Sequence, residues 1–318
     1  MRRSRVLCLG LALAVAVVAL PSLAAALADA AAGGGADEDL KLSVFDAVVL
    51  GLVEGLTEYL PVSSTGHLLV TNELLGLNTS EKAENLLDTY AIGIQAGAIL
   101  AVLVVYQERI RQMIDGLLGR SEEGRRVLIA VLVAFAPTAV IAQLLYDRFR
   151  DAIFGPGPIA IAWFVGGVAI LALSRARFFD RVGIELADIT MRQAFLIGVL
   201  QTVAVWPGTS RSLTTIIAGV LVGLSLRAAV EFSFLLGLIT LSAATAYAAL
   251  GDGAELIDTF GVVNPLIGLV VAFVSAVAAV RWMVGYLNEK GFEIFGWYRL
   301  AIGLAMFAAI GTGALDWS

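Results

Sequence analysis

The sequence predicts an all-α, polytopic membrane protein with six transmembrane helices and two re-entrant helix hairpins in an inverted-topology repeat. Three observations support this prediction: an apolar composition, six long apolar stretches, and two further apolar stretches that are interrupted near their centres. Apolar residues make up 59% of the 318 residues and charged residues 15%, whereas soluble domains contain about 25% charged residues. The composition therefore indicates that most of the chain lies in a lipid bilayer.

Charge and cysteine content exclude two classes of function. The net charge is −6 and the arginines are scattered between apolar stretches, so no basic surface is available to neutralise a nucleic-acid backbone. The single cysteine, Cys8, lies in the amino-terminal apolar stretch, and neither a disulfide nor a thiolate metal site is expected. Nucleic-acid partners and thiol chemistry are excluded on these grounds.

The amino terminus has the pattern of a secretory signal. Basic residues precede an apolar run, and the small-residue segment Ala26-Leu27-Ala28 follows it. We interpret residues 1–28 as a signal peptide; the alternative is an uncleaved first helix, because the run is only slightly shorter than a membrane span. Residues 29–42 are mostly Ala, Gly and acid and are expected to be a linker, and residues 43–318 a single membrane-embedded catalytic domain.

The remaining apolar stretches divide into continuous and interrupted ones. Six are long enough to cross a hydrocarbon core of about 30 Å: residues 87–106, 127–146, 158–174, 226–249, 263–286 and 295–314. Stretches 43–78 and 190–223 instead carry Pro and small polar residues at their centres. Irregular backbone at membrane depth is tolerated only where it is buried in protein or lines a polar cavity. Each interrupted stretch therefore predicts a re-entrant hairpin.

The loops predict the orientation of the chain. Residues 107–126 contain five arginines and residues 175–181 three, whereas residues 250–262 contain three acids and no Lys or Arg. The positive-inside rule places the first two loops in the cytoplasm and the third outside. The first hairpin then enters the membrane from outside and the second from inside.

The two interrupted stretches also resemble each other. The segments before each central Pro align with Glu54 opposite Gln201, and a slip of one residue places Ser64 opposite Ser210. Together with the opposite entry sides, this similarity predicts an inverted-topology repeat. In such repeats discontinuous helices meet near the midplane and form the binding site.

The first interrupted stretch contains two acids. Glu54 and Glu58 are four residues apart, so their carboxylates lie on one face of a helix. A charged residue at the centre of an inserted helix costs about 2.5–3.5 kcal/mol. Carboxylates with this spacing suit a hard divalent cation such as Mg²⁺ or Ca²⁺. The alternative is that both acids pair with cations at the membrane interface.

His67 is the only histidine and follows Ser64 by three residues in a Ser-Ser-Thr-Gly turn. A lone histidine on an apolar face is more often a hydrogen-bonded core residue than a catalyst. One helical turn from Ser64, however, an imidazole with an ordinary pKa of about 6.5 is suited to act as general base or acid.

The second interrupted stretch has the features of a phosphate site. Arg211 follows a Pro-Gly break at the expected start of a half-helix, among Ser210, Ser212 and Thr215. Free N–H groups at a helix amino terminus and the planar donors of an arginine together favour phosphate. The hydroxyl residues also suit helix caps. Glu231 is expected to be a structural partner or the counter-ion of Arg211.

The segments E-G-L-T-E-Y-L-P-V-S-S-T-G-H and P-G-T-S-R-S, followed by E-F-S-F-L-L, closely resemble the undecaprenyl-diphosphatase (bacitracin-resistance) family. The resemblance runs from about residue 43 to the carboxy terminus. It implies an inverted repeat with two re-entrant hairpins and the hydrolysis of undecaprenyl diphosphate to the monophosphate with a divalent cation. That reaction recycles the lipid carrier of cell-envelope glycan synthesis. The expected location is the plasma (inner) membrane, with the site open to the outer face.

The resemblance also implies roles for individual residues. The residues with implied catalytic roles are Glu54, Glu58, Ser64, His67 and Arg211. The two acids, Glu54 and Glu58, are also implied metal ligands. Those with implied diphosphate contacts are Ser63, Thr65, Ser210, Arg211, Ser212 and Thr215. Leu213 departs from the family, which usually has glycine there, and is expected to narrow the approach to the phosphate or redirect a backbone N–H.

Two mechanisms and two rival functions remain open at this point. Either Ser64, deprotonated by His67, attacks the terminal phosphorus, or a metal-activated water does so. The rivals are a transporter or flippase of a lipid phosphate and a non-catalytic lipid-binding or scaffold protein. A carrier needs counter-ions such as Arg211 but neither a nucleophile nor a base. The expected partners are a polyprenyl diphosphate and the bilayer, with a homodimer as one option.

Overall fold

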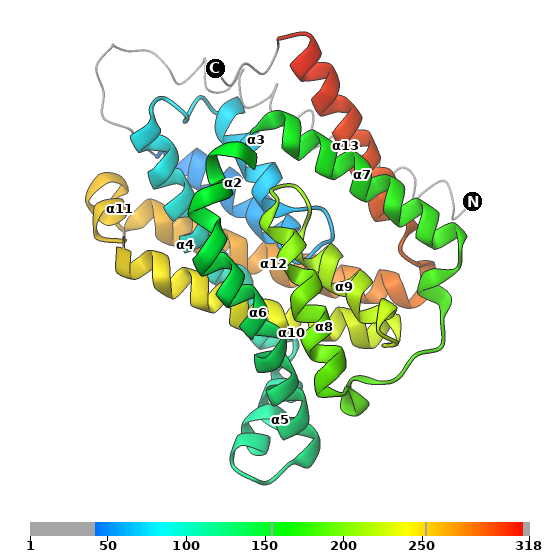
Figure 1. Cartoon of the computed structure of the whole chain (residues 1–318). Coiled ribbons are helices and arrows are strands. Elements are labelled where there is room, and N and C mark those ends of the chain that lie inside the picture. Colours follow the sequence, from blue (N-terminus) through cyan, green and yellow to red (C-terminus); the bar gives the residue numbers. More distant parts are fainter. Residues whose placement is uncertain (1–41, 154, 252, 314–318) are drawn as a thin grey trace.

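The computed structural model describes residues 42–153, 155–251 and 253–313, and these residues are helical almost throughout (Figure 1). Within these ranges the only β-pairing is an isolated bridge between Ile184 and Leu224. The all-α prediction is therefore confirmed. The proposed signal peptide and nearly all of the linker lie outside the described residues.

Six helices of the described chain are long and apolar enough to cross a membrane. They are α4 (Glu81–Val105), α6 (Glu122–Ile153), α7 (Pro156–Arg175), α10 (Leu226–Gly251), α12 (Val263–Lys290) and α13 (Glu293–Gly311). Each overlaps one of the six stretches predicted from the sequence. The prediction of a polytopic membrane protein with six spanning helices is confirmed.

Each interrupted stretch forms two short helices joined by a turn. The first comprises α2 (Val44–Thr57) and α3 (Ser64–Leu74). The second comprises α8 (Met191–Gln201), the 3₁₀ turn η3 (Thr202–Val205) and α9 (Arg211–Leu221). The central Pro and small residues thus end one helix and allow another to begin in a new direction.

The elements follow the same order twice. A short helix hairpin, a long helix, a short helix and two long helices occur as α2–α7 and again as α8–α13, with α5 (Gln107–Leu117) and α11 (Gly253–Phe260) as the short helices. The packing repeats as well, because α2 contacts α12 and α8 contacts α6. The chain therefore contains an internal repeat of whole helix groups.

Backbone conformation gives the register of the repeat. Ser63 and Ser210 precede α3 and α9 with φ angles of 73° and 76°, a region that non-glycine residues seldom adopt. The same offset, 147 residues, separates position 63 from 210 and position 54 from 201. The predicted one-residue slip is therefore wrong: Ser63 corresponds to Ser210, and Ser64 corresponds to Arg211.

Equivalent glycines bring both hairpins close to their neighbouring long helices. A side chain at Gly51 would collide with the carbonyl group of Gly268 in α12, and one at Gly198 would collide with that of Ala134 in α6. Positions 51 and 198 have the same 147-residue offset. The close approach of a hairpin to a long helix is thus built in the same way in both halves.

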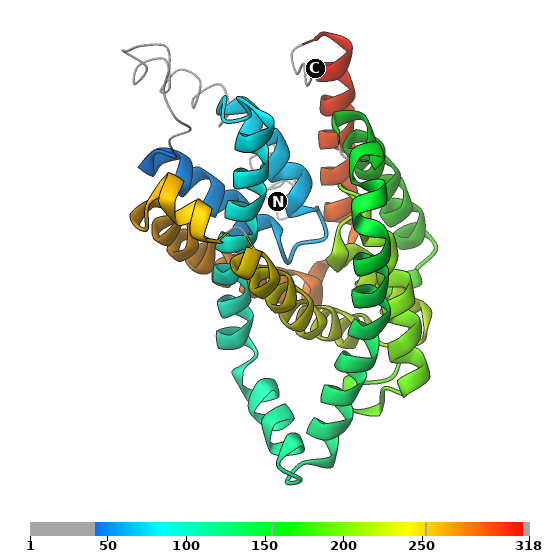
Figure 2. The same cartoon turned by 60° about the vertical axis from the view of Figure 1, so that its left-hand side comes forward.

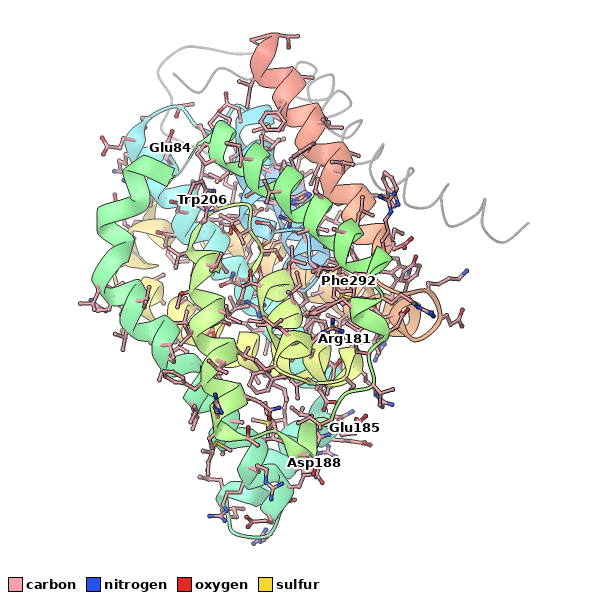
Figure 3. All side chains as sticks on the ribbon, turned by 45° about the vertical axis from the view of Figure 1, so that its right-hand side comes forward. Glu84, Arg181, Glu185, Asp188, Trp206 and Phe292 are labelled. Carbon is pink, nitrogen blue, oxygen red and sulfur yellow. The ribbon has the colours of Figure 1, made fainter. Side chains whose placement is uncertain are left out.

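The two arginine-rich loops lie at the same end of the molecule. Helix α5 projects from one end (Figures 1 and 2). Arg181, Glu185 and Asp188 lie towards that end, whereas Glu84 and Trp206 lie towards the opposite one (Figure 3). This arrangement agrees with the predicted threading, in which both arginine-rich loops share one side of the membrane.

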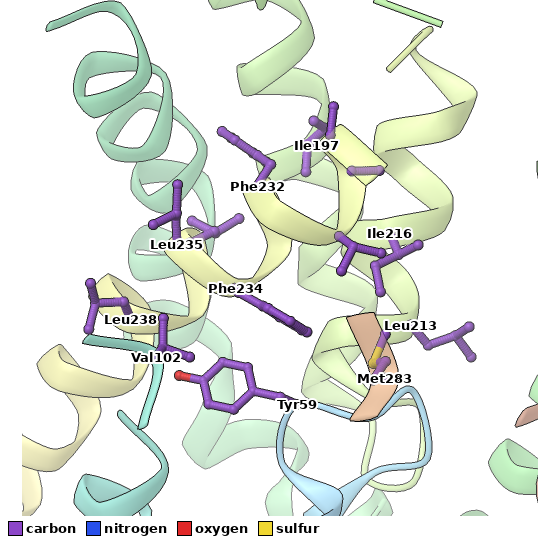
Figure 4. Close-up of a cluster of buried hydrophobic side chains, with 14 of the residues drawn as sticks. Tyr59, Val102, Ile197, Leu213, Ile216, Phe232, Phe234, Leu235, Leu238 and Met283 are labelled. Carbon is purple, nitrogen blue, oxygen red and sulfur yellow. The ribbon is translucent and has the colours of Figure 1, made fainter. Parts of the chain in front are cut away.

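Leu213 lies in the hydrophobic core. Its side chain is buried and belongs to a cluster that includes Ile216, Phe234 and Tyr59 (Figure 4). Its backbone N–H donates to Ser210 Oγ at 3.3 Å. Leu213 is thus packed among apolar side chains, and its effect on the approach to the phosphate stays a prediction.

Candidate active site

Side chains from both hairpins meet at Glu58. One carboxylate oxygen of Glu58 accepts a hydrogen bond from Ser64 Oγ, and the other accepts from Arg211 Nη2 at 3.2 Å. Glu58 and Ser64 are buried, and the Arg211 side chain is 11% exposed. The hydroxyl, the carboxylate and the guanidinium predicted from two separate motifs are thus joined in one site.

Helix α3 starts at this site with free donors. No side-chain hydrogen bond caps α3 at Ser63, whereas Ser210 caps α9. The first N–H groups of a helix have no partner inside the helix, and the helix dipole makes this end positive. The start of α3, beside Ser64, is therefore suited to bind an anion.

Side chains from surrounding helices hold the turn of the first hairpin. Each of its four successive carbonyl oxygens contacts a nitrogen or hydroxyl of a side chain. These pairs are Leu60 O with Ser212 Oγ at 2.8 Å, Pro61 O with Arg299 Nη1 at 3.3 Å, Val62 O with Trp163 Nε1 at 3.1 Å, and Ser63 O with His67 Nδ1 at 2.6 Å. The unusual backbone at Ser63 is therefore fixed from several sides.

His67 is bound to other partners than Ser64. Its Nδ1 lies 2.6 Å from Ser63 O and its Nε2 lies 2.7 Å from Tyr298 Oη. Because a carbonyl oxygen only accepts, Nδ1 donates, and Nε2 of the neutral ring accepts from Tyr298. The predicted Ser64–His67 pair is not formed. The group placed to accept the proton of Ser64 is Glu58.

The hydroxyl groups of the second hairpin mainly hold the hairpin itself. Ser212 and Thr215 are fully buried. Ser212 Oγ also lies 3.0 Å from Ser210 Oγ, and Thr215 Oγ1 lies 2.6 Å from Ser233 Oγ. These bonds indicate a structural role in place of the predicted diphosphate contacts for Ser212 and Thr215.

A cavity of ≈ 340 Å³ opens beside the site. Its polar lining includes Glu54, Ser64, Thr65, Asn72, Gln95, Gln201 and Arg211, and apolar side chains such as Leu68, Leu69, Ile92 and Ala244 complete it. Of the predicted phosphate contacts, Thr65 and Arg211 therefore reach this cavity. A lining that is polar in one part and apolar in another suits an anionic group on an apolar chain.

Several polar atoms of this lining are left without a partner. In the described chain Glu54 Oε1, Gln201 Oε1 and Arg211 Nε are buried and make no hydrogen bond. Gln95 approaches the Glu54 carboxylate, and Gln201 Nε2 donates to Thr138 Oγ1 at 2.5 Å. Buried polar atoms without partners are costly. Glu54, Gln201 and Arg211 all line the cavity, so an acid, an amide and a guanidinium that are not fully paired lie around it, as suits a phosphate with a cation.

Glu231 lies elsewhere. It accepts a hydrogen bond from Arg109 Nε at 2.6 Å and lines a second cavity of ≈ 1050 Å³ with Arg109, Arg227 and Tyr106. The structural role predicted for Glu231 is confirmed, and its alternative role as counter-ion of Arg211 is wrong, because Glu58 fills that position.

These observations define a class: a polytopic membrane protein in which two broken helices bring a serine, a carboxylate and an arginine together beside one partly apolar cavity. Within that class the chain belongs to the bacitracin resistance protein BacA family, whose model matches residues 47–305. The resemblance found in the sequence is thereby confirmed.

Curated relatives agree with this membership. The chain is 43% identical over 262 residues to an undecaprenyl-diphosphatase of Sorangium cellulosum, covering 81% of this chain and 84% of the relative. It is 41% identical over 277 residues to undecaprenyl-diphosphatase 2 of Rhodospirillum rubrum, covering 86% and 97%. The similarity thus extends over most of the length of both relatives.

Proposed function

We propose that this protein hydrolyses undecaprenyl diphosphate to the monophosphate and phosphate in the membrane, and so recycles a lipid carrier for cell-envelope glycan synthesis. The observation that carries the proposal is the Ser64–Glu58–Arg211 site, which both hairpins build together. The relatives named undecaprenyl-diphosphatase support the same substrate.

In the proposed reaction Ser64 Oγ attacks the terminal phosphorus of the diphosphate. Glu58 takes the hydroxyl proton through the hydrogen bond already in place. The bond from phosphorus to the bridging oxygen breaks, and undecaprenyl monophosphate leaves. Water then attacks the phosphoserine, and Ser64 recovers its proton as phosphate departs. Arg211 and the first N–H groups of α3 hold the charged oxygens of the transferred phosphoryl group.

A divalent cation, Mg²⁺ or Ca²⁺, fits the acids of this site. Glu54 lines the cavity and has one carboxylate oxygen, Oε1, that is buried without a hydrogen bond, and Glu58 lies one helical turn further along. No group of three His, Cys, Asp or Glu side chains suited to a metal occurs in the described part of the chain. The remaining ligands would therefore be phosphate oxygens and water, as Mg²⁺ commonly has. When bound, the cation neutralises charge on the phosphate oxygens.

The rival function, transport of a lipid phosphate, is less well supported. A carrier needs Arg211 to hold an anion, but it has no use for a serine hydroxyl that donates to a buried carboxylate. This hydrogen bond prepares a nucleophile and therefore favours hydrolysis.

Purified protein in detergent is expected to release phosphate from a polyprenyl diphosphate. Phosphate release is expected to stop when EDTA is added and to recover when Mg²⁺ or Ca²⁺ is supplied. Glu54→Gln is expected to raise the cation concentration needed for half-maximal rate, because the substitution removes a charged ligand. The control is Glu84→Gln, at the exposed start of α4, which is expected to match wild type. Undiminished release in EDTA would contradict the cation, and no release under any condition would contradict the function.

We propose further that the protein lies in the plasma (inner) membrane with its cavity open to the outer face, on the basis of the arginine-rich loops. In a Cys8→Ser background, an impermeant thiol reagent added outside is expected to label Gly253→Cys in α11 but not Ser121→Cys between α5 and α6. Labelling of Ser121→Cys alone would show that the chain has the opposite orientation. The homodimer stays a prediction.

A further inference from the structure

Arg299 connects the two hairpin turns to each other. Its side chain, on α13, is completely buried. Nη1 donates to Pro61 O at 3.3 Å, and Nη2 donates to Gly208 O and to Ala162 O, each at 2.8 Å. Pro61 belongs to the turn of the first hairpin and Gly208 to that of the second, whereas Ala162 lies in α7. One guanidinium thus bridges both turns.

The three partners of Arg299 are carbonyl oxygens, and no ion pair of Arg299 occurs in the described chain. A buried cation without a carboxylate is costly. Helix packing alone requires no charge at this position, since the α7–α13 contact is otherwise made by apolar and small residues such as Ile302 and Gly303. The fork of Arg299 matches two turns that offer free carbonyl groups.

The positions of the bridged carbonyls relate Arg299 to the reacting groups. Pro61 is three residues from both Glu58 and Ser64, and Gly208 is three residues from Arg211. We infer that Arg299 is a positioning residue that sets the separation between the Ser64–Glu58 pair and Arg211. This inference rests on the proposed function, because it assigns Arg299 to the geometry of that reaction.

Two adjacent glycines of α7 allow the inference to be tested without removing Arg299. A methyl group at Gly166 would lie 2.7 Å from Arg299 Nε and 2.8 Å from its Cζ. A methyl group at Gly167 would instead lie 2.7 Å from Leu300 N and 2.9 Å from Gly296 O, which belong to the α13 backbone. Gly166→Ala therefore displaces the guanidinium, whereas Gly167→Ala strains the same helix contact beside it.

The experiment compares kcat, KM and the midpoint of thermal unfolding for wild type, Gly166→Ala, Gly167→Ala and Arg299→Lys. For Gly166→Ala and Arg299→Lys we expect kcat to fall on the order of 100-fold with a much smaller change in KM, as for a misplacement of about 1 Å. Gly167→Ala is expected to lower the unfolding midpoint and to keep kcat. If Arg299→Lys does not fold, Gly166→Ala still carries the test.

A second measurement does not depend on turnover. Spin labels at Glu73 and Leu221, near the carboxy-terminal ends of α3 and α9, report the distance between the hairpins. The distance distribution is expected to shift or broaden in Arg299→Lys and Gly166→Ala and to stay unchanged in Gly167→Ala. Equal losses of kcat in both glycine variants, with unchanged distances, would overturn the inference. Wild-type protein that releases no phosphate would instead contradict the proposed function, and the label distances would still report on the bridge.

Discussion

Replacing Ser64 by alanine is expected to remove phosphate release, by about 10³-fold or more, while the affinity for the diphosphate stays nearly unchanged. The Ser64 hydroxyl forms the new bond to phosphorus in the proposed reaction, so its loss acts on the chemical step. Glu58→Gln is expected to reduce kcat to a similar extent, because the amide cannot take the proton that the carboxylate accepts. Ser64→Ala with Glu58→Gln is expected to be little worse than either alone, since a nucleophile and its base act as a unit.

The measurements are phosphate release and equilibrium binding of a polyprenyl diphosphate. Thr240→Ala is the matched control, because Thr240 is another hydroxyl that lines the cavity and has no part in the proposed reaction. His67→Ala is expected to lower kcat less than Glu58→Gln, since His67 contacts Ser63 O and Tyr298. A larger loss in His67→Ala than in Glu58→Gln would restore the histidine as the base. Substantial turnover by Ser64→Ala would point to attack by metal-activated water.

Arg211→Lys is expected to lower kcat/KM by on the order of 10²–10³-fold, although the charge is retained. Arg211 uses both ends of its fork: Nη2 donates to Glu58 at 3.2 Å and Nη1 donates to Ser233 O at 3.0 Å. The ammonium of lysine is a point charge without the planar fork, so it cannot occupy the positions of both Nη1 and Nη2. The loss is expected in KM and kcat together, because in the proposed reaction Arg211 contacts the phosphate before and during its transfer.

Arg109→Lys provides the comparison for this substitution. Arg109 also binds a glutamate, Glu231, but is partly buried beside the other cavity, so a general effect of replacing an arginine that is paired with a glutamate appears in both variants. Near-wild-type kcat/KM in Arg211→Lys would show that charge alone suffices at this position and would remove the argument for planar recognition of the phosphate.

The sequence predicted those parts of the site that leave a local signal. Acids four residues apart and an arginine after a Pro-Gly break stand out in an apolar chain, because each is costly in a membrane without a function. The six spans and both interrupted stretches are predicted from the same contrast between polar residues and the apolar chain around them. The resemblance to the family follows from the same breaks, since the segments that carry it lie at them.

The partner of Ser64 could not be predicted from helical spacing. His67 follows Ser64 at a distance typical of one helical face, whereas Glu58 precedes it across a turn. The positive φ of Ser63 starts α3 in a direction that turns the Ser64 hydroxyl back towards Glu58. Single-sequence periodicity contains no information about such a turn.

Residues brought in by long-range packing were missed as well. Gln95, Gln201 and Tyr298 reach the site or its histidine from separate helices. Arg299 is near one end of an apolar stretch, where arginines commonly extend to the membrane surface; its contact with Pro61 spans 238 residues. Only Gln201 had a signal in the sequence, through its alignment with Glu54.

The internal repeat has a consequence for how this protein tolerates change. Equivalent positions hold unlike groups: Ser64 corresponds to Arg211, and Glu54 to Gln201. Two identical halves would carry either two hydroxyls or two guanidinium groups here, and neither pair would supply both the nucleophile and the phosphate-binding group of the proposed reaction. Division of labour between the halves therefore makes them non-interchangeable. Exchanging residues 64 and 211 would preserve the composition of the site but place each group on the wrong hairpin.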